Sequence, residues 1–113
     1  MSDCVFCKII NNEIPSARVY EDDRIIAIND LNPMAPVHVL FIPKDHICCA
    51  NALDESNCDI VGHIFSVIPK VAKELGLTNG YRVVNNCGED GGQTVMHLHF
   101  HLLGGKKLDV KMA

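Results

Sequence analysis

Residues 94–103 read Thr-Val-Met-His-Leu-His-Phe-His-Leu-Leu, so three histidines alternate with large apolar residues. Because successive side chains of a β-strand point to opposite faces, this alternation predicts a strand over Thr94–Leu103. On that strand, one face holds the three imidazoles of His97, His99 and His101. The other face is expected to enter the core and holds Met96, Leu98, Phe100 and Leu102. Since imidazole suits acid–base, nucleophilic or metal chemistry near neutral pH, this strand marks the expected site.

Four more strands are expected before this one, each a short run of apolar or β-branched residues between turn residues. They are Ala17–Glu21, Ile25–Asn29, Val37–Ile42 and Tyr81–Asn86. The first two flank the dipeptide Asp22-Asp23 and therefore predict a hairpin.

A long helix is predicted over Leu53–Leu75, where apolar residues recur at three- and four-residue spacing. Asp54 or Asn57 is expected to cap its start, and Gly76 to end it in a left-handed conformation. Pro69 removes one backbone hydrogen bond inside the helix, so a kink is expected there.

Short strands around one long helix indicate an α+β fold with a five-stranded antiparallel sheet. Residues Cys4–Asn11 add a short N-terminal segment, interpreted as a helical turn or a metal knuckle. The chain has 113 residues, 48% of them hydrophobic, which fits a single domain over residues 1–113. A chain of this size buries only about two-thirds of its unfolded surface, so a partner subunit would help to stabilise it.

Charge and hydropathy exclude several classes of protein. The formal net charge is −4 and the ten Lys and Arg residues are scattered, which argues against a basic stripe that binds nucleic acid. The longest apolar runs span about five residues, whereas a bilayer-spanning helix needs about 20. No basic-then-apolar signal segment opens the chain. We therefore expect a soluble, cytoplasmic protein that binds neither nucleic acid nor membrane.

The loop before the histidines, Cys87–Gln93, has features of a phosphate site. Its glycines let backbone N–H groups approach an anion, and the Gln93 amide and Thr94 hydroxyl add neutral donors. Taken alone, the loop fits a plain turn equally well. Beside three imidazoles it predicts a seat for a phosphoryl group, which the middle one, His99, can attack to form a covalent phosphoryl-histidine.

The histidine-rich stretch resembles the His-φ-His-φ-His-φ-φ signature of the histidine-triad (HIT) family of nucleotide hydrolases and transferases, where φ is hydrophobic. The resemblance extends over almost the whole chain. It includes Cys7-Lys8-Ile9-Ile10, Glu13-Ile14-Pro15, Glu21-Asp22-Asp23, Asp30 with Pro33 and Ala35-Pro36, Val37-His38 with Ile42-Pro43-Lys44, and Gly91-Gly92-Gln93-Thr94. The chain is similar to the small members that cleave purine nucleoside phosphoramidates and aminoacyl-adenylates. The resemblance also implies a homodimer whose sheet continues from one subunit to the other.

The resemblance implies roles for the matching residues. His99 is the expected nucleophile, His101 a donor to a phosphate oxygen, and His38 a support for the triad through a hydrogen bond. The rest of the expected phosphate pocket comprises Gln93, Thr94, Asn86 and Gly92, of which the first two contact the phosphate or the leaving group.

The resemblance further implies that the nucleoside lies beside Asp30, whose carboxylate suits two adjacent ribose hydroxyls, and that apolar residues bracket the base. The apolar residues expected to bracket the base are Val5, Phe6, Ile9, Ile28 and Leu31. These residues fit a hydrophobic core equally well, because an apolar base slot and an apolar core look alike in sequence.

The pair Cys4-x-x-Cys7 supplies half of a tetrahedral zinc site. Spacing leaves the other ligands open among His46, Cys48, Cys49 and His97. The family resemblance selects His46 and His97 and implies a structural zinc, which would remove His97 from acid–base work. A zinc-free pair of thiols is the alternative. The remaining cysteines are expected to be reduced and buried as small hydrophobes, and they are Cys48, Cys49, Cys58 and Cys87.

We therefore expect a hydrolase of purine nucleoside phosphoramidates or aminoacyl-adenylates that works through a covalent nucleotidyl-histidine intermediate. The alternatives are a dinucleoside polyphosphate hydrolase, a nucleotidyl transferase, a nucleotide-binding protein with vestigial activity, or a metal-binding module in which the triad holds the metal. No acidic cluster suited to magnesium is evident in the sequence, which predicts a chemical step that needs no metal.

Overall fold

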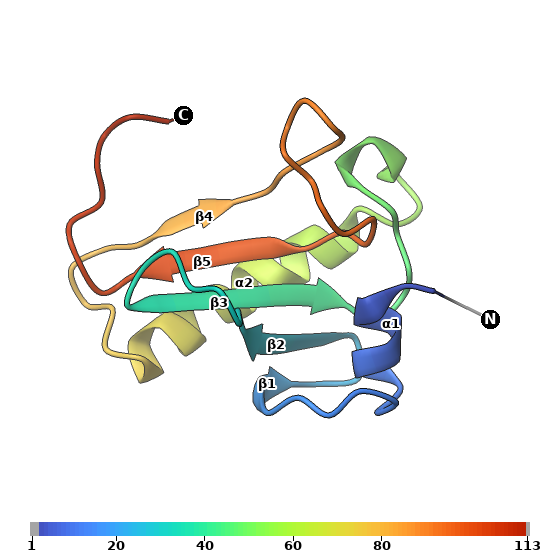
Figure 1. Ribbon diagram of the computed structural model, residues 1–113, viewed down its shortest axis with the longest axis horizontal. Helices are drawn as coiled ribbons and strands as arrows, with labels where there is room; N and C mark the ends of the chain where they lie inside the picture. Colours follow the sequence, from blue (N-terminus) through green and yellow to red (C-terminus); the bar gives the residue numbers. More distant parts are fainter. Residues whose placement is uncertain (1–2, 113) are drawn as a thin grey trace.

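The computed structural model describes residues 3–112 and arranges them as strands with two α-helices. In chain order the elements are α1 (Val5–Ile10), β1 (Arg18–Glu21), β2 (Ile25–Asn29), β3 (Val37–Pro43), a 3-10 turn (Ala50–Ala52), α2 (Asp59–Glu74), β4 (Arg82–Val84) and β5 (Phe100–Gly104). The strands form one antiparallel sheet in the order β1-β2-β3-β5-β4 (Figure 1). The predicted α+β class, with five antiparallel strands, one long helix and a short N-terminal helix, is confirmed. Between residues 3 and 112, no helix is long and apolar enough to cross a membrane.

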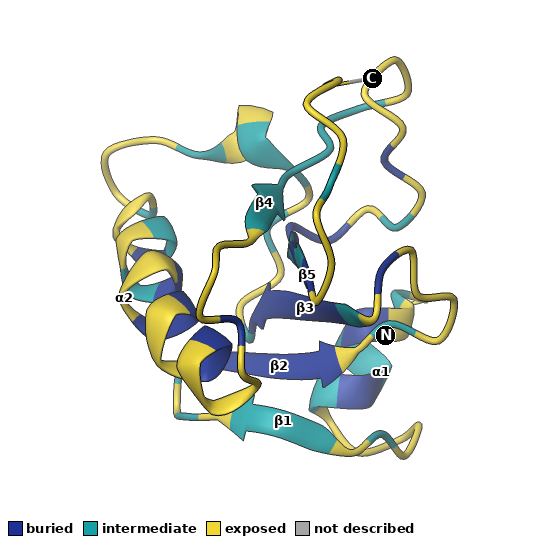
Figure 2. Ribbon diagram, turned by 90° about the vertical axis from the view of Figure 1, so that its left-hand side faces the viewer, coloured by how far each residue is buried: buried dark blue, intermediate teal, exposed yellow. Residues whose placement is uncertain are grey.

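The two helices cover opposite faces of the sheet, as Figure 2 shows for β2 and β3. Because neighbouring residues of a strand face opposite ways, Ile25 of β2 joins the core cluster that includes Ile64 of α2. The next residue, Ile26, joins a second cluster around Phe6 of α1. The middle of the sheet is therefore buried on both faces. The segment after β3 and the segment before β5 both approach the start of α1, where His46 and His97 lie next to Cys7 and Cys4.

The histidine-rich strand is shorter than the alternation predicts. The strand β5 begins at Phe100, and residues 94–99 are irregular, because the N–H of Leu98 donates to the carbonyl of Ile47 at 2.6 Å instead of joining the sheet ladder. Met96 is 51% exposed, so the prediction that it enters the core is wrong. The prediction is confirmed for Leu98, Phe100 and Leu102, which are buried. The strand β4 is likewise shorter than its predicted range.

The helix α2 begins later than the periodicity predicts. Residues 54–58 form a separate turn, in which the carbonyl of Asp54 accepts the N–H groups of Asn57 and Cys58. The carboxylate of Asp54 is occupied by the N–H of Ser56 at 2.8 Å. Neither Asp54 nor Asn57 caps the helix, whose N-cap is Cys58, so that prediction is wrong.

The other end of α2 agrees with the sequence. Gly76 follows the helix with φ +79°, the left-handed conformation that glycine adopts without strain. Pro69 lies inside the helix, as expected. The kink at Pro69 stays a prediction.

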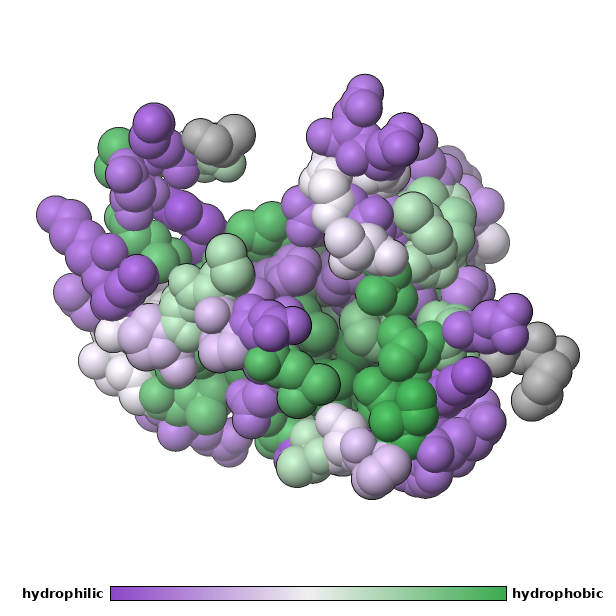
Figure 3. All heavy atoms as spheres, in the orientation of Figure 1, coloured by the Kyte–Doolittle hydropathy of each residue, from purple (hydrophilic) through white to green (hydrophobic). Residues whose placement is uncertain are grey.

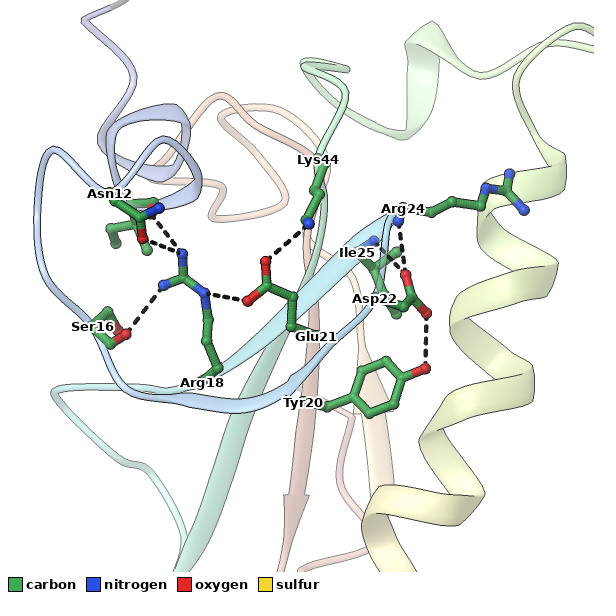
Figure 4. Close-up of polar contacts among 10 residues, drawn as sticks. Asn12, Ser16, Arg18, Tyr20, Glu21, Asp22, Arg24, Ile25 and Lys44 are labelled. Carbon is green, nitrogen blue, oxygen red and sulfur yellow. Dashed lines mark hydrogen bonds and ion pairs between the residues drawn. The ribbon is translucent and has the colours of Figure 1, made fainter.

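A polar network fixes the hairpin of β1 and β2 and ties it to α1 (Figure 4). The Arg18 guanidinium donates to the carbonyl of Ile9 at 2.9 Å and pairs with Glu21 at 3.3 Å. In the turn, the Asp22 carboxylate accepts the N–H of Arg24 at 2.8 Å and the hydroxyl of Tyr20 at 2.8 Å. Burial raises the pKa of Asp22, but these hydrogen bonds outweigh it and hold the pKa well below its usual range. The predicted hairpin is confirmed.

The cysteines outside the N-terminal pair are not buried, contrary to the sequence-based expectation. Cys48 and Cys58 are exposed, and Cys49 and Cys87 are partly exposed. All four lie in loops or at a helix start, where the chain runs over the surface.

Candidate functional site

The imidazole of His99 is held in one orientation just before β5. Its Nδ1 lies 2.6 Å from the carbonyl oxygen of His97, which can only accept, so Nδ1 carries the proton and donates. The ring is 7% exposed and meets the ring of Phe6 edge-on, with centroids 5.0 Å apart. The lone pair of His99 therefore lies on Nε2.

A second pair of imidazoles lies on neighbouring strands. His38 of β3 accepts the N–H of Met34 on Nδ1 at 3.0 Å, so its proton is on Nε2. That nitrogen lies 2.9 Å from Nδ1 of His101 on β5 and donates to it. His101 consequently holds its own proton on Nε2, as a hydrogen-bond donor.

The two rings of this pair are neutral near pH 7. The pKa of His101 is lowered to about 4, mainly by burial and also by the neighbouring His99 and His38, which disfavour a positive charge, while the charge of Asp30 acts in the opposite direction. Burial also lowers the pKa of His38, although the charge of Asp30 acts in the opposite direction. A site that holds neutral imidazoles is suited to nucleophilic chemistry and to hydrogen-bond donation towards a phosphate.

Asp30 lies beside this pair. One carboxylate oxygen, Oδ2, is 3.4 Å from Nε2 of His38, and the other accepts the N–H of Asn32 at 2.8 Å. The carboxylate side chain is 21% exposed, so it is open to a ligand while it contacts the triad. Its predicted contact with ribose stays a prediction.

The predicted phosphate loop is held by its own amides. Gln93 is buried, accepts the N–H of Gly88 at 2.9 Å and donates to the carbonyl of Cys48 at 2.7 Å. Asn86 donates to the carbonyl of Gly91 at 2.7 Å. The side chain of Gln93 thus positions the loop, and its contact with a phosphate stays a prediction.

The predicted phosphate pocket also includes Thr94 and Gly92. Thr94 is exposed, and Gly92 adopts φ +80°. Asn85, which the sequence reasoning missed, donates from Nδ2 to the carbonyl of His99 at 2.9 Å. An amide at the end of a predicted strand carries no signal that distinguishes it from an ordinary turn residue.

The residues predicted to bracket a base divide into two groups. Phe6, Ile9 and Ile28 are buried together in the second core cluster. Val5 is 39% exposed and Leu31 is 94% exposed. Figure 3 shows apolar side chains gathered in the middle of the molecular face that carries α1, between hydrophilic regions. The predicted contact of these residues with a base stays a prediction.

The N-terminal cysteines meet two histidines from distant segments. Nδ1 of His97 lies 3.3 Å from Sγ of Cys4 and 3.6 Å from Sγ of Cys7, and Nδ1 of His46 lies 3.3 Å from Sγ of Cys7. All four ligand atoms lie within 4.8 Å of one another. Zn–S and Zn–N bonds of about 2.3 and 2.0 Å place tetrahedral ligands about 3.5 Å apart, so this donor set fits zinc. The alternative ligands that spacing left open, Cys48 and Cys49, are not in the cluster.

The orientation of His97 agrees with a ligand role. Its Nε2 donates to the carbonyl of Pro43 at 2.8 Å, which leaves the lone pair on Nδ1, towards the cysteines. Burial lowers the pKa of His97, and the Pro43 hydrogen bond partly offsets this. The ring is therefore neutral and available to a metal, and both of its nitrogens are then occupied.

Comparisons with known proteins agree with this geometry. The family described as "scavenger mRNA decapping enzyme C-term binding" matches residues 3–112. A 14 kDa zinc-binding protein from Zea mays is 46% identical over 110 residues, which cover 96% of this chain and 86% of that protein.

Solved structures are similar over nearly the whole chain. A histidine triad protein from Clostridium difficile has 56% identity and a TM-score of 0.94, covering 98% of this chain and 97% of that one. A HIT family hydrolase from Clostridium thermocellum has 53% identity and a TM-score of 0.96, covering 100% of this chain and 99% of that one.

Proposed function

This chain belongs to the histidine-triad family, and from that premise we propose that it hydrolyses purine nucleoside phosphoramidates or aminoacyl-adenylates to the nucleoside monophosphate. The similar protein from Clostridium thermocellum carries the name of a hydrolase, which supports this class of activity. A covalent nucleotidyl-histidine is the proposed intermediate.

One observation carries the proposal: Nδ1 of His99 donates to the carbonyl of His97 at 2.6 Å. That bond leaves the lone pair of a neutral imidazole on Nε2, the form that a nucleophile requires. The ring of Phe6 and the Asn85 amide, which holds the backbone of His99, restrain the group further.

In the first step, Nε2 of His99 attacks phosphorus and the bond from phosphorus to the leaving group breaks. For a phosphoramidate, the leaving nitrogen takes up a proton and departs as an amine. In the second step, water attacks phosphorus and the P–N bond to His99 breaks. The monophosphate leaves, a proton goes to solvent, and the imidazole is restored.

The other residues stabilise charge and position the substrate. The Nε2–H of His101 donates to a non-bridging phosphate oxygen, where charge grows during attack. Asp30 accepts the ribose hydroxyls, and Val5 and Leu31 contact the base, with Phe6, Ile9 and Ile28 behind them. Thr94 and Gln93 act on the phosphate or leaving group, at the end of the loop that includes Asn86 and Gly92.

We propose that Cys4, Cys7, His46 and His97 hold a structural zinc ion. A zinc ion with four protein ligands joins chain segments and leaves no position for water. Here it would join α1 to the segment after β3 and to the start of the triad. The donor geometry and the zinc-binding relative from Zea mays support this assignment.

We further propose that the protein is a homodimer in the cytoplasm. Phe65 and Leu75 are large apolar residues exposed on or next to α2, and a partner subunit would cover them. The expectation that the protein binds neither nucleic acid nor membrane rests on the scattered basic residues and the short apolar runs.

The test is AMP release from adenosine 5′-phosphoramidate by the wild-type chain and by His99→Ala, each with and without brief chelation. We expect kcat to fall by about 10³-fold or more in His99→Ala. His63→Asn changes a histidine outside the site, one that pairs with Asp22 at 2.7 Å, and should keep its activity. Wild-type release should survive chelation.

A folded wild-type chain that releases no AMP would overturn the phosphoramidase assignment. Diadenosine polyphosphates would then be assayed, and nucleotide binding without turnover would indicate vestigial activity. Trapping of a nucleotide on His99 after a rapid quench in alkaline denaturant, which preserves the acid-labile P–N bond, would support the covalent intermediate.

A further inference from the structure

Two adjacent cysteines that the proposed function does not use lie on the segment between β3 and α2. Sγ of Cys48 is 3.0 Å from Sγ of Cys49, so the two thiols meet at one point. The four-residue cluster proposed to hold zinc includes neither of them. Cys48 and Cys49 therefore form a separate vicinal dithiol.

The backbone on both sides of the vicinal dithiol is held by hydrogen bonds. The carbonyl of Cys48 accepts the side-chain amide of the buried Gln93 at 2.7 Å. The carbonyl of Cys49 accepts the N–H of Ala52 at 3.0 Å, across the 3-10 turn. A site that is positioned before binding loses less conformational entropy on binding, so these bonds favour a ligand held by both sulfurs.

The vicinal dithiol is open to solvent. Cys48 is exposed and Cys49 is partly exposed, although free cysteine is among the most often buried residue types. A small molecule in solution can therefore reach the pair without unfolding the chain.

Covalent geometry opposes a disulfide within the pair. Cα atoms of adjacent residues lie about 3.8 Å apart, whereas a disulfide needs about 4.4–6.8 Å. The sulfur atoms, now 3.0 Å apart, would also have to approach to about 2.05 Å. A single atom bound between them removes both demands, because it enlarges the ring and keeps the two sulfurs apart.

The distance between the sulfurs indicates which atom suits this position. Cysteine sulfur binds soft acceptors best. Two sulfurs on one tetrahedral zinc ion lie about 3.8 Å apart, given Zn–S bonds of about 2.3 Å, and a linear Cu(I) ion holds its two sulfurs on opposite sides. Trivalent arsenic is soft and pyramidal, and its bond angles are close to a right angle, so its sulfurs lie nearer to each other. The short separation in the vicinal dithiol therefore favours trivalent arsenic.

We propose that Cys48 and Cys49 form a binding site for trivalent arsenic. With an arsenical of the form R–As=O, two As–S bonds form and the two S–H bonds break. The oxygen leaves arsenic and takes both protons as water. Arsenic stays trivalent, so the step needs neither an oxidant nor a reductant. Binding at this pair does not depend on which substrate the enzyme hydrolyses.

The test is mass spectrometry of the full-length chain, supplied with zinc and treated with one equivalent of phenylarsine oxide. We expect a mass increase equal to the reagent less one water, with an unchanged zinc content. The adduct should survive excess mercaptoethanol, a monothiol, and should be removed by dimercaptopropanol, because only a second dithiol competes with two As–S bonds. After trypsin digestion, the arsenic should be found on residues 45–70.

Matched serine variants identify the two sulfurs. Cys48→Ser and Cys49→Ser should each abolish the adduct that survives mercaptoethanol, whereas Cys58→Ser, on the same tryptic peptide, and Cys87→Ser should keep it. Circular dichroism checks that each variant is folded.

Four results would overturn the proposal. The first is a wild-type chain that forms no adduct resistant to mercaptoethanol. The second is an adduct that persists in both Cys48→Ser and Cys49→Ser, and the third is its loss in Cys87→Ser. The fourth is arsenic on the tryptic peptide of residues 1–8 together with loss of zinc, which would place the reaction at the N-terminal cysteines.

Discussion

Nε2 of His38 lies 2.9 Å from Nδ1 of His101, on adjacent antiparallel strands. Because Met34 donates to the other nitrogen of His38, the direction of this bond is set, and it turns the N–H of His101 away from β3. The sheet thus controls which nitrogen of a neighbouring histidine carries the proton.

Replacing His38 by alanine should lower the rate of hydrolysis. Nδ1 of His101 would lose its donor, and leaving such a group unsatisfied costs about 1–3 kcal/mol, or about 5- to 150-fold in kcat. The measurement is steady-state AMP release, with His63→Ala as the control histidine. A kcat equal to that of the wild type in a folded His38→Ala protein would show that this bond does not support catalysis.

The charge state of His101 predicts a pH dependence of stability. Its pKa falls from 6.5 to about 4 on folding, mainly through burial, so between these values the unfolded chain binds more protons than the folded one. The contribution of His101 to stability is therefore complete above pH 6.5 and decreases as the pH falls towards 4.

Denaturant unfolding of the wild type and His101→Asn across this range should reveal the difference. The free energy of unfolding should fall more steeply with decreasing pH in the wild type. Parallel curves, or an NMR titration of His101 with a midpoint near 6.5, would contradict the assignment.

Removal of the proposed zinc should destabilise the fold. Cys7→Ser is expected to lose the metal and to lower Tm by at least about 5 °C, since about 1 kcal/mol shifts Tm by about 4–8 °C in a domain of this size. Elemental analysis and thermal unfolding measure the two effects. The matched variant Cys58→Ser, which changes an exposed thiol at the start of α2, should keep one zinc per chain. Equal zinc content in both variants would rule out Cys7 as a ligand.

Two glycine-to-alanine substitutions should act in opposite directions. A Cβ at Gly91 would collide with the carbonyl oxygen of Cys87 and lie 2.9 Å from its backbone nitrogen, so Gly91→Ala should distort the loop and lower both kcat and stability. A Cβ at Gly62 in α2 meets nothing within 4 Å, so Gly62→Ala should stabilise the protein by about 0.5–1 kcal/mol. Denaturant unfolding gives the stability of both variants, and AMP release gives their kcat. A Gly91→Ala protein of unchanged stability would show that the loop is not tightly packed.

Local patterns predicted most of the elements but not all of their ends. The hairpin around Asp22 and the left-handed Gly76 follow from turn chemistry within a few residues. The start of β5 does not, because the N–H of Leu98 bonds to Ile47, far away in the sequence. An alternating sequence fits a strand paired in a sheet and also an extended segment outside the sheet. For residues 94–99, the contact with Ile47 selects the second.

The same distinction applies to the site. The order of residues along the chain is enough to show that three imidazoles follow a glycine-rich loop and that Cys4 and Cys7 are three residues apart. The orientation of His97, with Nδ1 towards those cysteines and Nε2 bonded to the carbonyl of Pro43, depends on contacts between segments far apart in the chain. An imidazole has two nitrogens, and partners that folding brings from other segments decide which of them holds the proton.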